Sequence, residues 1–204
     1  EHLIAKDDAH GATLPAGQQE ALAAAFKSCL PKIEKTDFNV DTHALGENAM
    51  PVTITQSEYM RRMKDMANIQ AGMSFYGDMP DMFTLVLNSD HKLIKQVLTD
   101  EEAACTADVA PIQAEMDEAE HRRSELNKSH EKLKADEIPQ ADKDELTELD
   151  KKRTELKNKK DAVYAAYAAQ NMTIRQLIDL ALLQNNMLKG EALNQFVRRT
   201  MEKI

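Results

Sequence analysis

The chain has 204 residues, 42% of them hydrophobic and 30% charged, with a formal net charge of −9 at pH 7. Nucleic acids and anionic membrane surfaces attract an excess of Lys and Arg, so this acidic balance argues against either as a partner. No apolar run approaches the roughly 18 to 20 residues of a membrane span. Two cysteines without paired spacing argue against a disulfide framework. We expect a soluble, cytoplasmic protein with a core of its own, and because the chain begins at Glu1 we interpret it as part of a longer protein.

The first part of the chain is expected to contain a tail and one helix. Residues 1–17 include glycine and proline and show little periodicity, which is typical of a linker. The stretch QQEALAAAFKSCL then has the apolar spacing of one helical face, and Pro31 should end the helix. The residues on that face are Leu22, Phe26, Cys29 and Leu30.

Three short strands are expected next. In DFNVDTHAL and PVTIT, apolar and polar residues alternate as in half-buried strands, and GEN joins the two. MFTLVLN, residues 82–88, is apolar enough to lie inside a sheet. A helix should follow in NSDHKLIKQVL, with Ser89 or Asp90 capping its N-terminus. Residues 18–102 are thus predicted to form an α+β domain in which helices flank a small three-stranded sheet.

Between the second and third strands, residues 57–82 hold six of the chain's 11 methionines. At helical spacing, one face of this stretch carries apolar side chains and the other carries Glu, Arg, Lys and Asp. Methionine fills gaps in protein cores, and it is also frequent on surfaces that accept many partners. Both interpretations stay open: an ordinary core helix, or an exposed amphipathic helix that contacts other proteins. The apolar face consists of Tyr59, Met60, Met63, Met66 and Ala67.

Residues 103–170 change to a Glu-, Lys- and Ala-rich composition that is typical of long helices. Two runs have seam residues alternately three and four positions apart, as in a coiled coil, and Pro139 separates the runs. We predict an inserted antiparallel hairpin with one centre of folding, which sets His130 opposite Leu149 and Arg123 opposite Leu156. The predicted seam comprises Ile112, Met116, Ala119, Arg123, Leu126, His130 and Leu133 on the first arm and Leu146, Leu149, Arg153, Leu156, Lys160, Val163 and Tyr167 on the second.

Residues 171–204 contain two further helices. The first opens with Thr173 and Gln176 in capping-box spacing, should end at Gly190, and is apolar over more than half of its girth. Two arrangements would bury this surface. Both helices pack against a second copy as a two-fold symmetric four-helix bundle, or they fold back onto the sheet of their own chain. The residues expected at the dimer interface are Ile174, Leu177, Leu180, Leu183, Leu193, Phe196, Val197 and Met201.

Nothing in the sequence predicts catalysis. The P-loop, GxGxxG, GxSxG and HExxH patterns are absent, and the six histidines never occur at i, i+4 with a partner ligand. No catalytic, cofactor-binding or metal-ligating residue is predicted, and the chain is not expected to be an enzyme. A coiled-coil structural scaffold, or a general protein-interaction module, stays open as the alternative to any more specific function.

Three segments follow one another in a distinctive order: PVTITQSEYMRRMKDMA, MFTLVLNSDHKLIKQVL and LIDLALLQNNMLKGEALNQFVRRTMEKI. The most specific pieces are the box from Asn88 to Lys95 and the closing Phe-x-Arg-Arg at Phe196, Arg198 and Arg199. Over residues 18–100 and 171–204 the chain resembles the C-terminal domain of the 90-kilodalton heat-shock chaperone family, in its bacterial form. Ser89 stands where that family usually has proline. The hairpin is an insertion that shorter bacterial members lack, so the resemblance implies nothing about its role.

The resemblance implies a dimerisation and client-contact module of an ATP-dependent chaperone that assists protein folding. The last two helices would form a constitutive homodimer interface, and the methionine helix would present its apolar face to non-native client proteins. The family's ATP and Mg site lies in an N-terminal domain, so no cofactor is expected in this chain. The chain ends in Met-Glu-Lys-Ile, without the acidic tail by which eukaryotic members recruit helical-repeat cochaperones.

Overall fold

The computed structural model describes residues 14–56, 58, 61–62, 66, 80–131 and 138–202. The chain divides into two compact units. The core unit takes its residues from Glu1–Asp100 and Ala168–Ile204, and the hairpin unit is Glu101–Tyr167. The described residues form five helices and a three-stranded sheet, so the predicted α+β class is confirmed. No helix in the described ranges has both the length and the apolar character needed to cross a bilayer.

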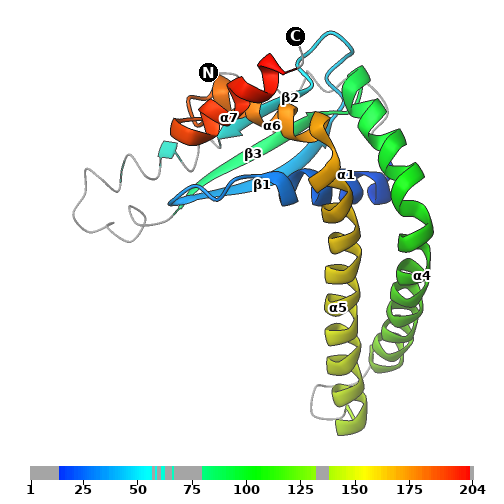
Figure 1. Ribbon diagram of the computed structural model, residues 1–204. Coiled ribbons are helices and arrows are strands. Elements are labelled where there is room, and N and C mark those ends of the chain that lie inside the picture. The colour runs from blue at the N-terminus through cyan, green and yellow to red at the C-terminus, as the bar shows by residue number, and fades with distance from the viewer. Residues whose placement is uncertain are drawn as a thin grey trace. The chain divides into compact units, whose positions relative to one another are not determined.

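The core unit is built on a sheet of β1 (Thr36–His43), β2 (Val52–Gln56) and β3 (Asp81–Asn88). The strand order is β1-β3-β2, with β3 parallel to β1 and antiparallel to β2 (Figure 1). The strand β3 is the central one, and its Leu85 and Leu87 are fully buried. This confirms the prediction that the apolar residues 82–88 lie inside a sheet. The first two strands follow one another in the chain but do not pair, since β3 lies between them.

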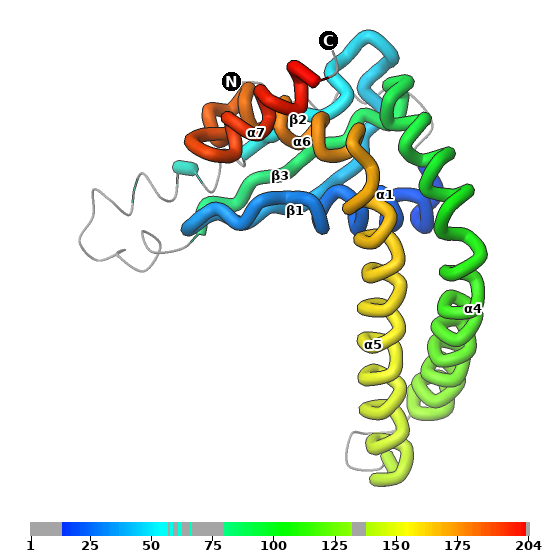
Figure 2. Tube along the Cα trace, in the orientation of Figure 1, coloured from blue at the N-terminus to red at the C-terminus, as the bar shows by residue number. Residues whose placement is uncertain are grey.

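Two helices pack on one another and on this sheet. Helix α1 (Ala16–Cys29) contacts β1, while α6 (Met172–Gln184), which comes from the far end of the chain, contacts β2 (Figure 2). Helix α1 starts within the predicted tail and ends before Pro31, as expected from the proline. The core is a single apolar layer formed by Leu22, Ala25, Phe26, Val52, Ile54, Leu85, Leu87, Ile174 and Ile178.

The first residue of the sequence box ties the end of β3 to the loop between β1 and β2. The fully buried Asn88 side chain accepts the Leu45 N–H at 3.1 Å and donates to the Gly46 carbonyl at 2.8 Å. The Asp90 carboxylate accepts the Gly46 N–H at 2.8 Å. Gly46 has φ of +85°, a left-handed backbone conformation that side chains disfavour. The box therefore has a structural role, because the side-chain oxygen and nitrogen of Asn88 both form hydrogen bonds with the backbone of this loop.

Helix α4 (Lys92–His130) begins with a cap that the sequence did not predict. The prediction of Ser89 or Asp90 was wrong, because the Asp90 carboxylate accepts the Gly46 N–H and the buried Ser89 hydroxyl has no hydrogen-bond partner in the described ranges. The His91 Nδ1 instead accepts the Leu93 N–H at 3.1 Å. An imidazole nitrogen with a free lone pair can satisfy one of the open N–H groups of a first helical turn.

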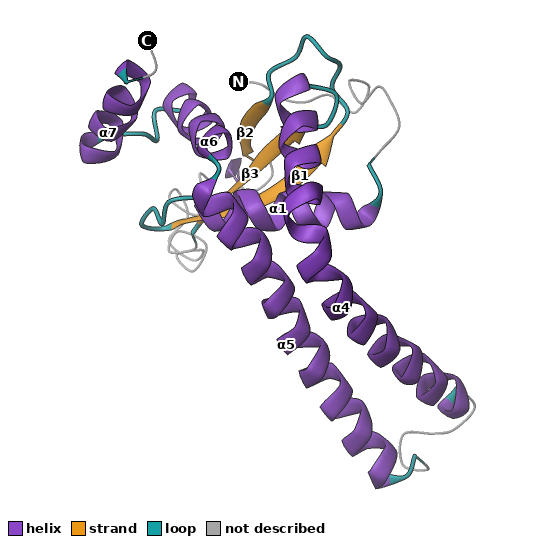
Figure 3. Cartoon of the chain, turned by 45° about the vertical axis from the view of Figure 1, so that its right-hand side comes forward, coloured by secondary structure: helices purple, strands orange, loops and turns teal. Residues whose placement is uncertain are grey.

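The hairpin unit consists of the distal part of α4 and most of α5 (Gln140–Gln170), which run antiparallel and side by side (Figure 3). The predicted antiparallel hairpin is therefore confirmed. Every described residue of the predicted seam is buried or half-buried, and Leu126 and Leu156 are among the most buried. Leu133 lies outside the described residues.

The pairing register of the two arms differs from the predicted one by about one heptad. The His130 Nε2 lies 2.7 Å from the Asp142 Oδ2, seven residues before the expected Leu149. The Arg123 Nε lies 2.9 Å from the Asp150 Oδ1, six residues before the expected Leu156. A heptad seam matches itself again after a shift of seven, so spacing alone cannot choose between the two registers. Pro139 lies just before the first residue of α5, where proline is tolerated, and not at the centre of the turn.

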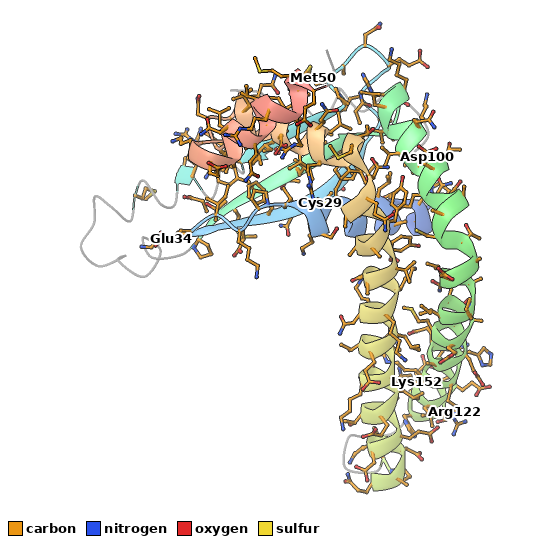
Figure 4. The ribbon with its side chains drawn as sticks, in the orientation of Figure 1. Cys29, Glu34, Met50, Asp100, Arg122 and Lys152 are labelled. Carbon is orange, nitrogen blue, oxygen red and sulfur yellow. The ribbon has the colours of Figure 1, made fainter. Side chains whose placement is uncertain are left out.

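The cations in the seam are bridged from the opposite arm. The Arg153 Nε lies 2.9 Å from the Glu120 Oε2, and the Lys160 Nζ donates to the Gln113 Oε1 at 2.8 Å. On the flank, the Arg122 Nε lies 2.6 Å from the Glu145 Oε1, and this hydrogen bond lowers the pKa of the Glu145 carboxyl. Figure 4 labels Arg122 on α4 and Lys152 on α5, the two arms that these bridges join.

The last two helices have other ends than predicted. Helix α6 is capped by the Asn171 side chain, which accepts the N–H groups of Thr173 and Ile174, so the predicted capping box is wrong. The helix ends at Gln184, because Asn186 takes the left-handed conformation, with φ of +55°, that often terminates helices. Gly190, the predicted terminator, instead opens α7 (Gly190–Met201) with φ of +58°.

Candidate functional site

The apolar girth of α6 is divided between two surfaces. Ile174 and Leu177 are 0% and 4% exposed within the core unit, where α6 packs against β2 and α1. Leu180 and Leu183, on the other side of the same helix, are 47% and 39% exposed. One face of α6 thus packs on the sheet of its own chain, which was one of the two predicted arrangements. The other face lies at the surface of the chain.

Helix α7 contains no buried residue. Leu193 and Phe196 are half-buried, whereas Val197 and Met201 are 43% and 70% exposed. A helix of 12 residues has little stability alone and depends on packing of its apolar face. In the described chain, α7 packs on α6.

An ion pair connects α7 to α6. The Arg199 Nη2 lies 2.5 Å from the Asp179 Oδ2, and both side chains are mostly shielded from solvent. This link holds two helices together that both carry exposed apolar side chains. We call these side chains the C-terminal apolar surface, and it consists of Leu180, Leu183, Val197 and Met201.

The methionine-rich segment is described only at four positions after β2, and residues 58, 61, 62 and 66 are helical. Gln56 is the last residue of β2, and Glu58 is already helical. The Glu58 carboxylate binds Arg61 and Arg62, and these hydrogen bonds lower its pKa. Met66 is 48% exposed. The other predicted contact residues, Tyr59, Met60 and Met63, lie outside the described residues.

One buried acid in the hairpin unit was missed by sequence reasoning. Glu101 is 1% exposed, and neither of its carboxylate oxygens has a hydrogen-bond partner among the described residues. Burial, followed by the nearby charge of Glu102, raises the pKa of Glu101 to about 8. Cys105 follows one helical turn later, and burial also raises the pKa of its thiol. The sequence signal that could have indicated this burial is the spacing of four residues, which places Glu101 on the same helical face as the apolar Val97 and Cys105.

The described residues contain no arrangement typical of catalysis or metal binding. No three His, Cys, Asp or Glu side chains among them come together as a metal site. His130 bridges the two arms of the hairpin, and His91 caps a helix. Among the predicted interface and contact residues that the structure describes, the most exposed are those of the C-terminal apolar surface and Met66.

Comparison with known proteins identifies relatives over the whole chain. The chain is 66% identical over 204 residues to the chaperone protein HtpG of Bacteroides thetaiotaomicron and 65% identical over 204 residues to that of Bacteroides fragilis. It is 38% identical over 199 residues, or 98% of the chain, to HtpG of Porphyromonas gingivalis. The chain spans about 30% of the length of these curated relatives. No family model matches the chain. No solved structure matches it either.

These matches define the class: the chain corresponds to the C-terminal part of a molecular chaperone. Within that class it belongs to the HtpG family, the bacterial form of the 90-kilodalton heat-shock chaperones that its motifs resemble. The hairpin segment, residues 103–170, lies within the matched region of all three relatives.

Proposed function

We propose that this chain is the C-terminal dimerisation and client-contact module of an ATP-dependent HtpG chaperone of the cytoplasm. Its relatives are chaperones, and the family resemblance places the ATPase in an N-terminal domain, whereas this chain corresponds to the C-terminal part. ATP and Mg therefore belong to the longer protein, and the chain itself should neither bind nor hydrolyse nucleotide. Its partners are a second copy of the chain and non-native client proteins.

The observation that carries the dimer is the C-terminal apolar surface. Leu180 and Val197 are each more than two-fifths exposed, on two helices that contact one another. Helix α7 has no buried residue within its own chain. If α6 and α7 of two copies formed a four-helix bundle, these side chains would leave water, which stabilises by about 25 cal/mol for each Å² of apolar surface.

The solution mass tests this part of the proposal. Multi-angle light scattering of the whole chain, over a range of concentrations, should give a mass near twice 22.9 kDa. A two-fold bundle with a large apolar interface does not dissociate on dilution to micromolar concentrations. A monomer at every concentration would contradict the dimer and leave α7 as an appendage of its own chain.

Met66 supports the client-contact part of the proposal. Its side chain is 48% exposed, although a methionine that served the core of its own chain would be buried. Methionine adapts its flexible thioether chain to differently shaped apolar partners, which suits a surface that must accept many non-native proteins. Glu58 forms ion pairs with Arg61 and Arg62, so other positions of the same helical segment carry charged side chains.

Substituting Met66 with aspartate separates a contact residue from a core residue. We expect Met66→Asp to leave the melting temperature unchanged, because the side chain is exposed, and to weaken suppression of the aggregation of a heat-denatured client severalfold. Met50→Asp is the matched control, since Met50 is 49% exposed in the loop before β2. A large drop in melting temperature for Met66→Asp would show that the methionines are core, and would favour the structural-scaffold alternative.

A further inference from the structure

Strand β1 forms one edge of the sheet, and its register shows which backbone groups point outward. The Lys35 carbonyl accepts the Asp81 N–H at 2.8 Å, and the His43 carbonyl accepts the Ser89 N–H at 2.9 Å. The register between these two bonds is continuous. Backbone groups alternate in direction along a strand, so odd-numbered residues of β1 face β3 and even-numbered residues face the edge.

The outward N–H groups are satisfied at both ends of β1 but not in its middle. The Thr36 N–H donates to the Ile33 carbonyl at 3.2 Å, and the Thr42 N–H donates to the Asp41 Oδ1 at 2.8 Å. Between them, the N–H groups of Phe38 and Val40 have no hydrogen-bond partner among the residues that the structure describes.

Proteins commonly protect such an edge with proline, lysine, a bulge or a very short strand. Strand β1 has eight residues, TDFNVDTH, with neither proline nor lysine and with no break in its register. Within the part of the chain that the structure describes, the middle of β1 is therefore a template on which another extended chain can pair. Hydrogen bonds within the chain limit this template at both ends, where the Thr36 N–H donates to the Ile33 carbonyl and the Thr42 N–H donates to the Asp41 Oδ1.

The side chains beside the open groups define the partner. Asp37 and Asn39 are exposed on one face of the sheet. On the other face Phe38 and Val40 are half-buried, and Phe38 packs with Phe83 at a centroid distance of 5.9 Å. A strand added here would set alternate residues next to a carboxylate and next to an apolar cluster, and opposite charges on neighbouring strands attract.

We propose that the edge of β1 binds an extended polypeptide segment in which apolar residues alternate with Lys or Arg. The proposal rests on the proposed client-contact function, because a non-native protein is the source of such a segment. Main-chain hydrogen bonds give affinity that tolerates many sequences, and the two flanking faces select the alternation of apolar and basic residues.

The test uses the full chain and a capped, fluorescent peptide, KVKVKVK, with EVEVEVE as the probe of opposite charge. Val40→Pro removes one outward N–H, while the ladder bonds to β3 come from the odd-numbered residues and stay in place. Val40→Thr keeps the N–H and the size of the side chain. We expect Val40→Pro to weaken binding of KVKVKVK by about tenfold, which corresponds to about 1.4 kcal/mol. Val40→Thr should bind it as the parent chain does.

A second variant covers the case in which proline disturbs the sheet. Asp37→Lys changes an exposed side chain, and should weaken binding of KVKVKVK and strengthen binding of EVEVEVE. Hydrogen exchange at the amides of Phe38 and Val40 should be fast in the free protein and slow with KVKVKVK bound. Slow exchange in the free protein, or equal binding of KVKVKVK to the parent chain, Val40→Pro and Asp37→Lys, would overturn the proposal. Suppression of the aggregation of a heat-denatured client, measured on the same variants, reports the client-contact function, so failure at this edge is distinguishable from failure of that function.

Discussion

Replacing Leu180 with glutamate is expected to convert the dimer into a folded monomer. In the single chain the side chain is 47% exposed, so a carboxylate there meets water and leaves the core unit intact. In a two-fold bundle the same position would be buried twice, once from each copy. A buried carboxylate without a partner costs several kcal/mol. The dissociation constant should therefore rise by at least about a hundredfold, measured by light scattering or sedimentation.

Leu177→Glu is the matched control on the same helix. Leu177 is 4% exposed and belongs to the face that packs within the core unit, so its substitution should unfold the chain and not merely separate two copies. Circular dichroism distinguishes the two results, because the Leu180 variant should keep its helical signal and the Leu177 variant should lose much of it. If Leu180→Glu keeps the full dimer mass, the C-terminal apolar surface is not the interface.

The division of α6 shows what periodicity reveals and what it does not. Sequence reasoning found that the helix is apolar over more than half of its girth, and it offered two ways to bury that surface. Leu177 and Leu180 have the same chemistry, and nothing local states which of them meets β2. That choice depends on the position of the sheet, which is set by the pairing of strands far away in the sequence.

The register of the hairpin shows the same limit of periodicity. Heptad spacing identified the seam, and the described seam residues are buried or half-buried. The register was wrong by about one heptad because a shift of seven preserves every seam position. Polar partners such as Asp142 for His130 and Glu120 for Arg153 distinguish the registers, and these pairs carry no periodic signal. The prediction of the helix cap at Asp90 was wrong for a similar reason, since the Asp90 carboxylate accepts the N–H of Gly46 in a distant loop and not an N–H of the helix.

The resemblance to the family rested on local motifs, which can be read directly from the order of the residues. Phe196 and the box that begins at Asn88 were visible as residue patterns, and the comparisons confirm the family. The burial of Glu101 was invisible, because it stands next to Glu102 in a strongly charged helix and only tertiary packing separates the two. An acid buried without a partner is destabilising in its charged form, which makes its effect measurable.

Glu101→Gln should make the hairpin unit more stable at alkaline pH and flatten the dependence of its stability on pH. The pKa of Glu101 is raised from an ordinary 4.5 to about 8 in the folded chain, so between these values the folded state holds a proton that the unfolded state has released. The free energy of unfolding therefore falls as pH rises through this window, by about 1.4 kcal/mol per pH unit. The contribution is fully present below pH 4.5 and is lost by pH 8.

Urea unfolding followed by circular dichroism at pH 5, 6.5 and 8 measures this effect. Glutamine has nearly the shape of the protonated acid and no charge to lose, so the two proteins should be similar at pH 5 and differ increasingly above it. Glu102→Gln is the matched control, because it removes only the smaller cause of the raised pKa of Glu101, and it should change the pH dependence much less than Glu101→Gln does. Parallel curves for the parent chain and Glu101→Gln would mean that water or a cation reaches the Glu101 carboxylate in solution.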